Sequence, residues 1–197
     1  MIRPYRSGDR DDLYRVCLQT GDSGDDATGR YRNPRVLGDV FVGPYLELQP
    51  DLAFVLDDGA GAGGYVLGAL DSVAFAAECE RTWWPPLRER YRDAPSDDGT
   101  LDEFALSWIR HPPPVPAAAG QFPSHLHIDL LPRWQSGGWG RRLIERLCEA
   151  LTAQGSPGVH LVVGLTNARA IGFYRHIGFA EVERRSFDLV LGRVLAP

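Results

Sequence analysis

Residues 130–143 read Leu-Leu-Pro-Arg-Trp-Gln-Ser-Gly-Gly-Trp-Gly-Arg-Arg-Leu, and this stretch decides the fold. An apolar run over residues 126–132 leads into it and is typical of a strand, and an amphipathic run over residues 141–153 predicts a helix after it. The turn between them has the spacing Gln-x-x-Gly-x-Gly. Backbone N–H groups in the first turn of a helix have no intrahelical partner, and glycines let a ligand approach the backbone closely. The stretch therefore predicts a site for an anion such as a pyrophosphate.

Three classes of glycine-rich turn are alternatives here. A Walker loop requires Gly-Lys-Ser/Thr, and this stretch has no lysine. A Rossmann turn requires a third glycine where Leu143 stands. The third class is the coenzyme A turn of the GNAT N-acetyltransferases, which the stretch resembles, and a glycine-rich loop without any ligand is the remaining alternative. The residues that carry the resemblance are Pro132, Trp134, Gln135, Gly138, Gly140 and Leu143.

Length and composition limit the class of protein. A chain of 197 residues is expected to form one domain, residues 1–197, with a core large enough to be stable alone. The net charge of −5 gives no support for nucleic acid as a partner. Cys17, Cys79 and Cys148 are scattered, which argues against a zinc site and a disulfide scaffold. Because the chain has neither an apolar signal core at its start nor a long apolar run, we expect a soluble cytoplasmic protein with no membrane partner.

Hydrophobic periodicity and turn residues predict the order of elements along the chain. Strands are predicted at residues 2–5, 52–56, 64–70, 124–130, 159–165, 181–185 and 186–191. Helices are predicted at residues 11–18, 33–45, 73–81, 87–91, 101–109, 141–153 and 167–178. Residues 57–63 are expected to close a hairpin, and residues 96–99 to form a turn. The acidic residues 20–29 are expected to form a solvated loop, with binding of a cation or a cationic substrate as the alternative.

Residues 72–115 form an insertion between the predicted hairpin and the central strand. Trp83-Trp84-Pro85-Pro86 is expected to interrupt its first helix, because prolines cannot donate a backbone hydrogen bond. Trp83, Trp84 and Trp108 could supply an aromatic wall to a substrate pocket, or they could simply pack the insertion onto the body of the protein.

The predicted central strand, Ser124-His-Leu-His-Ile-Asp-Leu130, alternates strictly between polar and apolar residues. His125, His127 and Asp129 share one face. Buried polar groups are costly unless they are paired or face a wet cleft, so His127 and Asp129 are the best-placed titratable residues. A structural His–Asp pair is the alternative. No third metal ligand lies near them in the sequence, so no metal site is predicted.

A second motif follows the predicted strand at residues 159–165. Asn167-x-x-Ala170-x-x-Phe173-Tyr174-x-x-x-Gly178-Phe179 resembles the second GNAT signature, and with the first motif the resemblance covers about the last 75 residues. It implies an α/β (α+β) fold with a mixed, splayed central sheet flanked by helices and a helical insertion.

The family resemblance also implies acetyl-CoA as the co-substrate, held between the central strand and the strand at residues 159–165. Backbone groups near Leu130 and Leu131 would meet the acetyl and pantetheine groups and supply an oxyanion donor, and Tyr174 would protonate the leaving thiolate. The implied cofactor-binding residues are Leu130, Leu131, Pro132, Gln135, Ser136, Gly137, Gly138, Trp139, Gly140, Arg141, Asn167, Ala170, Phe173 and Tyr174.

A narrower resemblance covers the insertion. Phe75, the Trp-Pro pair, Tyr91, Phe122-Pro123-Ser124 and Asp129 are similar to the acetyltransferase-like C-terminal domain of eukaryotic O-GlcNAcase. Eukaryotic members of that family depart from the pyrophosphate-turn signature, whereas this chain keeps its glutamine and both glycines, so the resemblance implies that it binds the cofactor.

The predicted function is transfer of an acetyl group from acetyl-CoA to a primary amine, on a small molecule or a peptide lysine. No glutamate lies on either strand that flanks the cleft, so Asp129 is the first candidate for the general base, His127 the second and Asp22 a more distant one. A catalytically silent acetyl-CoA binder, acting as a sensor or interaction module, is the alternative, and transfer of a longer acyl group is a third reading.

Overall fold

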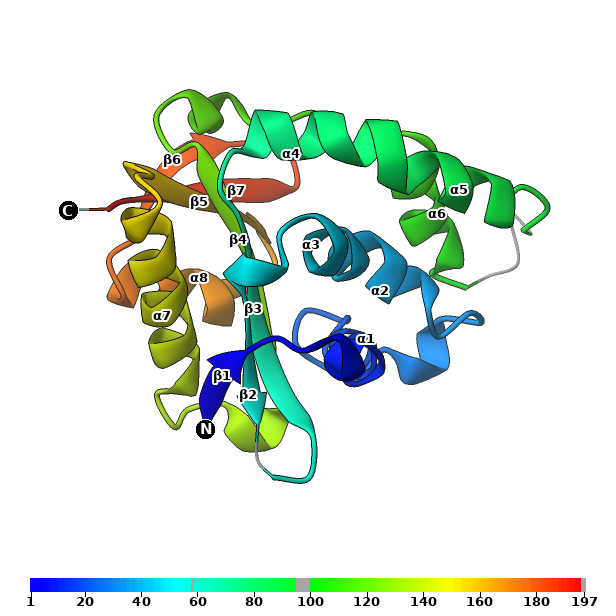
Figure 1. The fold of residues 1–197 in the computed structure, drawn as a ribbon, viewed down its shortest axis with the longest axis horizontal. Coiled ribbons are helices and arrows are strands. Elements are labelled where there is room, and N and C mark those ends of the chain that lie inside the picture. Colours follow the sequence, from blue (N-terminus) through cyan, green and yellow to red (C-terminus); the bar gives the residue numbers. More distant parts are fainter. Residues whose placement is uncertain (58, 95–99, 196–197) are drawn as a thin grey trace.

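The computed structural model describes residues 1–57, 59–94 and 100–195, which form a seven-stranded sheet with helices on both faces (Figure 1). The strand order is β1-β2-β3-β4-β5-β7-β6. The strands are β1 (Ile2–Pro4), β2 (Ala53–Asp57), β3 (Ala62–Ala69), β4 (Ser124–Leu130), β5 (Gly158–Gly164), β6 (Ala180–Arg184) and β7 (Asp188–Val194). Among the strand pairs of the described residues, only β4–β5 is parallel. The predicted class, a mixed sheet flanked by helices, is confirmed.

The sheet opens between its two central strands. β4 and β5 pair at only two positions, Ser124 with Val159 and His125 with His160. On its other edge β4 stays paired with β3 as far as Leu130. The second half of β4 therefore has strand neighbours on one side only, which leaves room for a cavity between β4 and β5.

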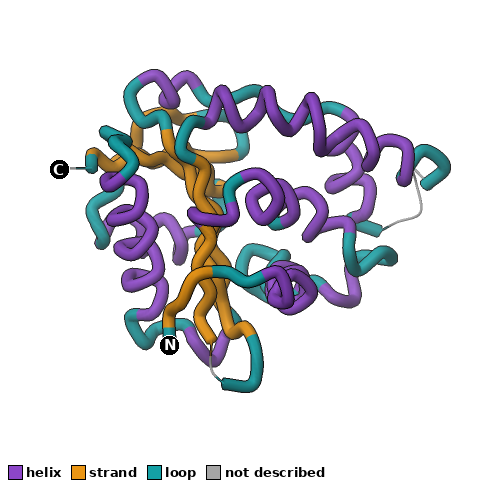
Figure 2. The backbone as a smooth tube through the Cα atoms, in the orientation of Figure 1, coloured by secondary structure: helices purple, strands orange, loops and turns teal. Residues whose placement is uncertain are grey.

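Two helical layers cover the two faces of the sheet (Figure 2). The long helix α7 (Trp139–Ala153) and α8 (Ala168–His176) pack on one face. The other face carries α1 (Arg10–Leu18), α2 (Val36–Phe41), α3 (Gly43–Leu48), α4 (Ser72–Glu78), α5 (Trp84–Arg90) and α6 (Asp102–Arg110). Short 3-10 turns lie at Ser7–Asp9, Thr28–Arg30, Pro50–Leu52, Ala117–Gly120 and Pro132–Trp134. Among the described residues, no helix is both long and apolar enough to cross a membrane.

Side-chain alternation along the strands assigns residues to these two layers. On β2, Phe54 and Leu56 belong to the core beneath α7, whereas Val55 belongs to the core beneath α1. β4 divides in the same way, because Leu126 packs with the α7 core and the ring of His127 stacks on Phe41 of α2. The alternation predicted for the central strand is thus the alternation between the two layers.

Two predicted helices are wrong in detail. The helix predicted at residues 33–45 is instead the two helices α2 and α3, which begin at Val36 and end at Leu48 with a break at Val42, because Pro44 enters the first turn of α3 and has no N–H to continue α2. The pair Pro85-Pro86 does not interrupt the insertion helix. The helical path passes from α4 through a π-helical turn at Cys79–Trp83 into α5, whose first turn accommodates the prolines.

The remaining elements match their predictions to within three residues at each end. The hairpin between β2 and β3 is confirmed, as is the pair of closing strands β6 and β7. Asp58, in the hairpin loop, and the predicted turn at residues 96–99 lie outside the described residues. Cys17, Cys79 and Cys148 are buried free thiols.

His125 ties β4 to the insertion and to α3. Its Nδ1 lies 2.7 Å from the hydroxyl of Ser72, and its Nε2 lies 2.8 Å from the hydroxyl of Tyr45. Burial lowers the pKa of His125 to about 3, so the folded protein keeps this ring neutral.

The buried imidazole should make the protein less stable in mild acid. An unfolded histidine binds a proton below pH of about 6.5, whereas folded His125 binds one only near pH 3. The unfolded state therefore gains protons first as the pH falls, and His125 alone should lower the free energy of unfolding by about 2 kcal/mol between pH 7 and pH 5. Urea unfolding of the wild type and of His125→Gln at both pH values measures the effect. Equal losses of stability in the two proteins would contradict it.

Candidate functional site

A cavity of about 490 Å³ lies where β4 and β5 separate. Four segments form its wall: the end of β4, the turn before α7 with the start of that helix, α8 from its cap to the residue after its end, and the loop after α1. The residues that line it are Thr20, Ser23, Gly24, Ile128, Asp129, Leu130, Gln135, Ser136, Gly138, Gly140, Arg141, Asn167, Arg169, Ala170, Phe173, Tyr174, His176 and Ile177.

The turn before α7 is held in place by its own side chain. Gln135 donates from Nε2 to the carbonyl oxygen of Leu130 at 2.9 Å, which fastens the turn to the end of β4. Gly138 caps α7 with φ +76°, a left-handed conformation that favours glycine. A Cβ on Gly140 would lie 3.1 Å from the ring of Phe173, so this glycine lets α7 and α8 approach each other. The two glycines thus have different structural roles.

The first turn of α8 also lines the cavity, next to the turn before α7. Asn167 caps α8, because it accepts a hydrogen bond at Oδ1 from the backbone N–H of Ala170 at 3.0 Å. Arg169 donates from Nη1 to Oε1 of Gln135 at 2.8 Å. The two signature motifs, separate in the sequence, are therefore joined by a hydrogen bond at the cavity.

The loop at residues 20–29 closes one side of the cavity. Asn167 donates from Nδ2 to the carbonyl oxygen of Ser23 at 3.4 Å, and Gly24 lies so close to Arg169 that a Cβ there would be 2.6 Å from its Nη2. Asp22 forms an ion pair with Arg30 and does not line the cavity. The loop therefore packs against α8. The sequence had predicted a solvated loop and gave no sign of this contact.

A polar cluster lies beside the cavity on the α1–α2 side of β4. The hydroxyl of Tyr65 donates to Oδ2 of Asp129 at 2.6 Å and lies 3.1 Å from Nε2 of His127. His127 Nε2 is itself 3.3 Å from the same carboxylate oxygen. The expected proximity of His127 and Asp129 is confirmed, and Tyr65 joins them as a third member.

Cys17 of α1 completes this cluster. Its sulfur, a His127 ring nitrogen and an Asp129 carboxylate oxygen all lie within 4.8 Å of one another. The fold thus places a third potential metal ligand, distant in the sequence, beside His127 and Asp129. Hydrogen bonds to Tyr65 already engage the histidine and the carboxylate, so the polar groups have partners without an ion. The absence of a metal site stays a prediction.

The hydroxyl and thiol groups around Asp129 are protonated at neutral pH. Burial and the nearby charge of Asp129 raise the pKa of Tyr174, of Tyr65 and of Cys17 above their ordinary values. Tyr174 lines the cavity and packs edge-on to Phe179. It is therefore a group that carries a proton at the cavity wall.

The backbone at the end of β4 limits which amide can bind an anion in the cavity. Leu131 donates its N–H to the carbonyl oxygen of Gly63 at 2.9 Å, so this predicted donor is occupied. Successive backbone groups of a strand point to opposite edges. The amide of Leu130 therefore faces the open edge of β4, on the same side as the carbonyl that Gln135 binds.

Most residues implied by the resemblance line the cavity, and a few do not. Within the described chain, Leu131, Pro132, Gly137 and Trp139 lie outside its lining, as does His127, which instead contacts Tyr65 and Asp129. Of the three insertion tryptophans, Trp84 is buried in the core, Trp83 donates to the backbone of Asp39, and only Trp108 approaches the site, by packing on Phe41 beside His127.

Tyr65 and Arg169 are functional candidates that sequence reasoning missed. Tyr65 lies directly opposite Asp129 in the β3–β4 ladder, and only the register of this strand pair reveals it. Arg169 lies inside the second motif, between Asn167 and Ala170, and its bond to Gln135 follows from the packing of α8 against the turn.

Comparisons with known proteins agree with this architecture. The model of the Acetyltransferase (GNAT) family matches residues 76–179. Protein O-GlcNAcase of Rattus norvegicus is 30% identical over 202 residues, which cover 98% of this chain but only 22% of that protein. Protein O-GlcNAcase of Mus musculus matches to the same extent.

Solved structures show the same fold. The crystal structure of SsHAT superposes with a TM-score of 0.93 at 39% identity and covers 100% of this chain and 98% of its own. Naa20 of Chaetomium thermophilum, solved in complex with a bisubstrate analogue, has a TM-score of 0.56 at 21% identity and covers 99% of this chain and 86% of its own. At that identity the likeness concerns the fold alone.

Proposed function

Because the chain belongs to the GNAT acetyltransferase family, we propose that it transfers the acetyl group of acetyl-CoA to a primary amine by direct attack. The observation that carries the proposal is the cavity between β4 and β5. Its wall combines the glycine turn before α7, the first turns of α8, and the two titratable groups Asp129 and Tyr174. The residues proposed to bind the cofactor and the residues proposed to transfer protons thus line one cavity.

The cofactor fits the residues present. The turn at Gly138 leads into a helix of fifteen residues, so its unpaired N–H groups and the helix dipole suit a pyrophosphate. Arg141 and Arg169 line the same wall and add positive charge. When bound there, acetyl-CoA supplies an activated acyl thioester, whose acyl end would lie toward Leu130 and Tyr174.

Residues near the proposed position of the thioester could act as the base, stabilise the negative charge that develops, and protonate the leaving group. An amine with a pKa of about 10 is protonated at neutral pH, so a base must remove a proton before or during attack. Asp129 is the proposed base. The N–H of Leu130 would stabilise the negative charge that develops on the thioester oxygen, and Tyr174 would give its proton to the departing sulfur.

Binding and turnover are tested in two steps with the wild-type chain. Calorimetric titration with acetyl-CoA and with CoA should give dissociation constants on the order of micromolar. Thiol release from acetyl-CoA is then measured against a panel of primary amines that includes a lysine peptide and small amines. Binding without turnover on any amine would favour a silent acetyl-CoA binder, and the absence of binding would contradict the proposal.

A further inference from the structure

We propose that Tyr65 is a positioning residue that holds the carboxylate of Asp129 and the imidazole of His127 as one proton-accepting unit. The inference rests on the proposed function, because it assigns a role within that reaction. Tyr65 belongs to neither GNAT signature motif and does not line the cavity. It would act through Asp129, which does line it.

The strand register puts the three residues together. In the antiparallel β3–β4 ladder, Tyr65 lies opposite Asp129, and Leu67 lies opposite His127. Side chains directly opposite each other in a ladder share a face of the sheet and lie close together, and diagonal neighbours remain within reach of a long side chain. The hydroxyl of Tyr65 therefore reaches both polar residues of β4.

The hydrogen bonds determine which carboxylate oxygen is available. A phenol has one proton, and Tyr65 donates it to Oδ2 of Asp129 at 2.6 Å. The phenol oxygen can then accept from His127 Nε2–H, at 3.1 Å, and that nitrogen lies 3.3 Å from the same Oδ2, while the Cys17 thiol also contacts the phenol. Oδ1 accepts no hydrogen bond from any described residue and is the oxygen left for an incoming amine.

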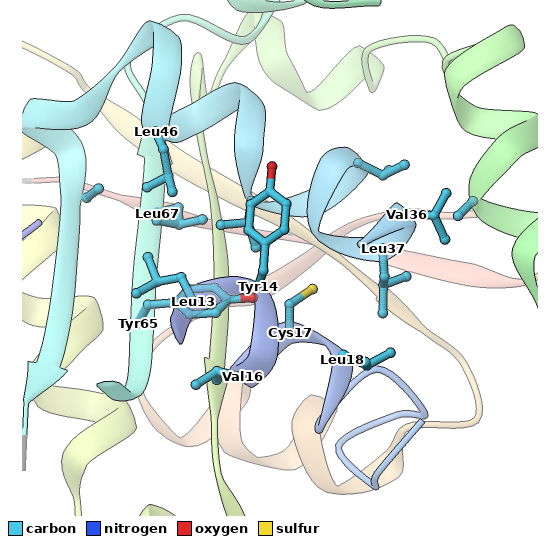
Figure 3. Close-up of a cluster of buried hydrophobic side chains, with 14 of the residues drawn as sticks. Leu13, Tyr14, Val16, Cys17, Leu18, Val36, Leu37, Leu46, Tyr65 and Leu67 are labelled. Atoms are coloured by element: carbon cyan, nitrogen blue, oxygen red, sulfur yellow. The ribbon is translucent and has the colours of Figure 1, made fainter. Parts of the chain in front are cut away.

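Burial keeps the hydroxyl of Tyr65 protonated, so that it can donate to Asp129. Its side chain is fully buried, and Figure 3 shows the ring extending from β3 beneath α1 toward Cys17. Burial and the charge of Asp129 raise the pKa of Tyr65 well above its ordinary value, so it remains a donor. The titratable groups that face the cluster are Cys17 of α1, His127 and Asp129 of β4, and Tyr174 of α8.

Removing only the hydroxyl should change two separate features of the kinetics. In Tyr65→Phe the carboxylate loses its fixed orientation, so kcat on the pH plateau should fall by about tenfold. A carboxylate without a donor also holds its proton more tightly, so the acid limb of the pH–kcat profile should move to higher pH. KM for acetyl-CoA should stay within about twofold, since the cavity wall is untouched.

The matched control is Tyr14→Phe. Tyr14 is also buried and also donates to a buried aspartate, Asp39, at 3.0 Å, but that pair lies outside the cavity lining. This variant loses a similar hydrogen bond and should keep the wild-type kcat and pH profile. A double variant, Tyr65→Phe with Asp129→Asn, should be no slower than Asp129→Asn alone, because Tyr65 acts through that carboxylate.

The outcomes separate this inference from the proposed function. A wild-type chain without turnover would remove the proposed function and the inference with it. With an active wild type, an unchanged pH profile in Tyr65→Phe, equal losses in Tyr65→Phe and Tyr14→Phe, or additive losses in the double variant would each overturn the inference alone. A tenfold loss with a displaced acid limb in Tyr65→Phe only would support it.

Discussion

Replacement of Asp129 by asparagine is expected to lower kcat by about 10²–10⁴-fold, the usual contribution of a general base. Asparagine keeps the size of the side chain and can still accept from Tyr65, but it cannot take a proton from the amine. Acetyl-CoA affinity should hardly change, because the turn before α7 and the first turns of α8 are intact. Steady-state thiol release and calorimetric titration measure the two quantities.

The control for this variant is Asp39→Asn. Asp39 is a buried carboxylate that accepts from Tyr14 and Tyr91, so its loss disturbs a comparable network away from the cavity. It should lower stability and leave kcat near the wild-type value. Unchanged turnover in Asp129→Asn would remove this residue from the mechanism and make His127 the candidate base.

The second large effect is expected at Gly138. Its φ of +76° and the empty space around an added Cβ mean that Gly138→Trp places an indole at the turn, where the pyrophosphate is proposed to bind. Acetyl-CoA affinity measured by calorimetry should fall by at least about 100-fold, which corresponds to about 2.7 kcal/mol. Thiol release should fall with it.

Gly155→Trp provides the matched control for backbone strain. Gly155 has φ +84°, and an added Cβ there also meets nothing, but it lies beyond the other end of α7. Both substitutions therefore impose a left-handed conformation on a bulky residue, and only one lies at the cavity. Equal loss of affinity in the two variants would point to a general loss of folding, and retained binding in Gly138→Trp would contradict the proposed cofactor site.

Features encoded locally in the sequence were predictable. The alternation of Ser124–Leu130 gave the division of β4 between two layers, and Asn167 signalled the start of α8 because an asparagine cap acts within one turn. The break before Pro44 and the passage of α4 into α5 were harder, since a proline at a first helical turn and a proline that ends a helix look alike in sequence.

Features that depend on long-range packing were not predictable. Tyr65 lies 64 positions before Asp129, and their contact requires the exact register of β3 against β4. The contact of Ser23 with Asn167 joins residues 144 positions apart. Neither pair leaves a periodic or spacing signal, so only the folded chain shows that they meet.

The division of the chain by the sheet has a consequence for altering the protein. The glycine turn and the second motif belong to the layer of α7 and α8, whereas His127 and Asp129 face the layer of α1 and α2 through Phe41 and Tyr65. Substitutions confined to the α1–α6 layer therefore alter the surroundings of the proposed base, while the proposed cofactor site in the opposite layer keeps its sequence. The two layers meet at the cavity, where Ser23 of the loop after α1 contacts Asn167 at the start of α8, so a substitution on one side can be combined with one on the other to test whether they are coupled.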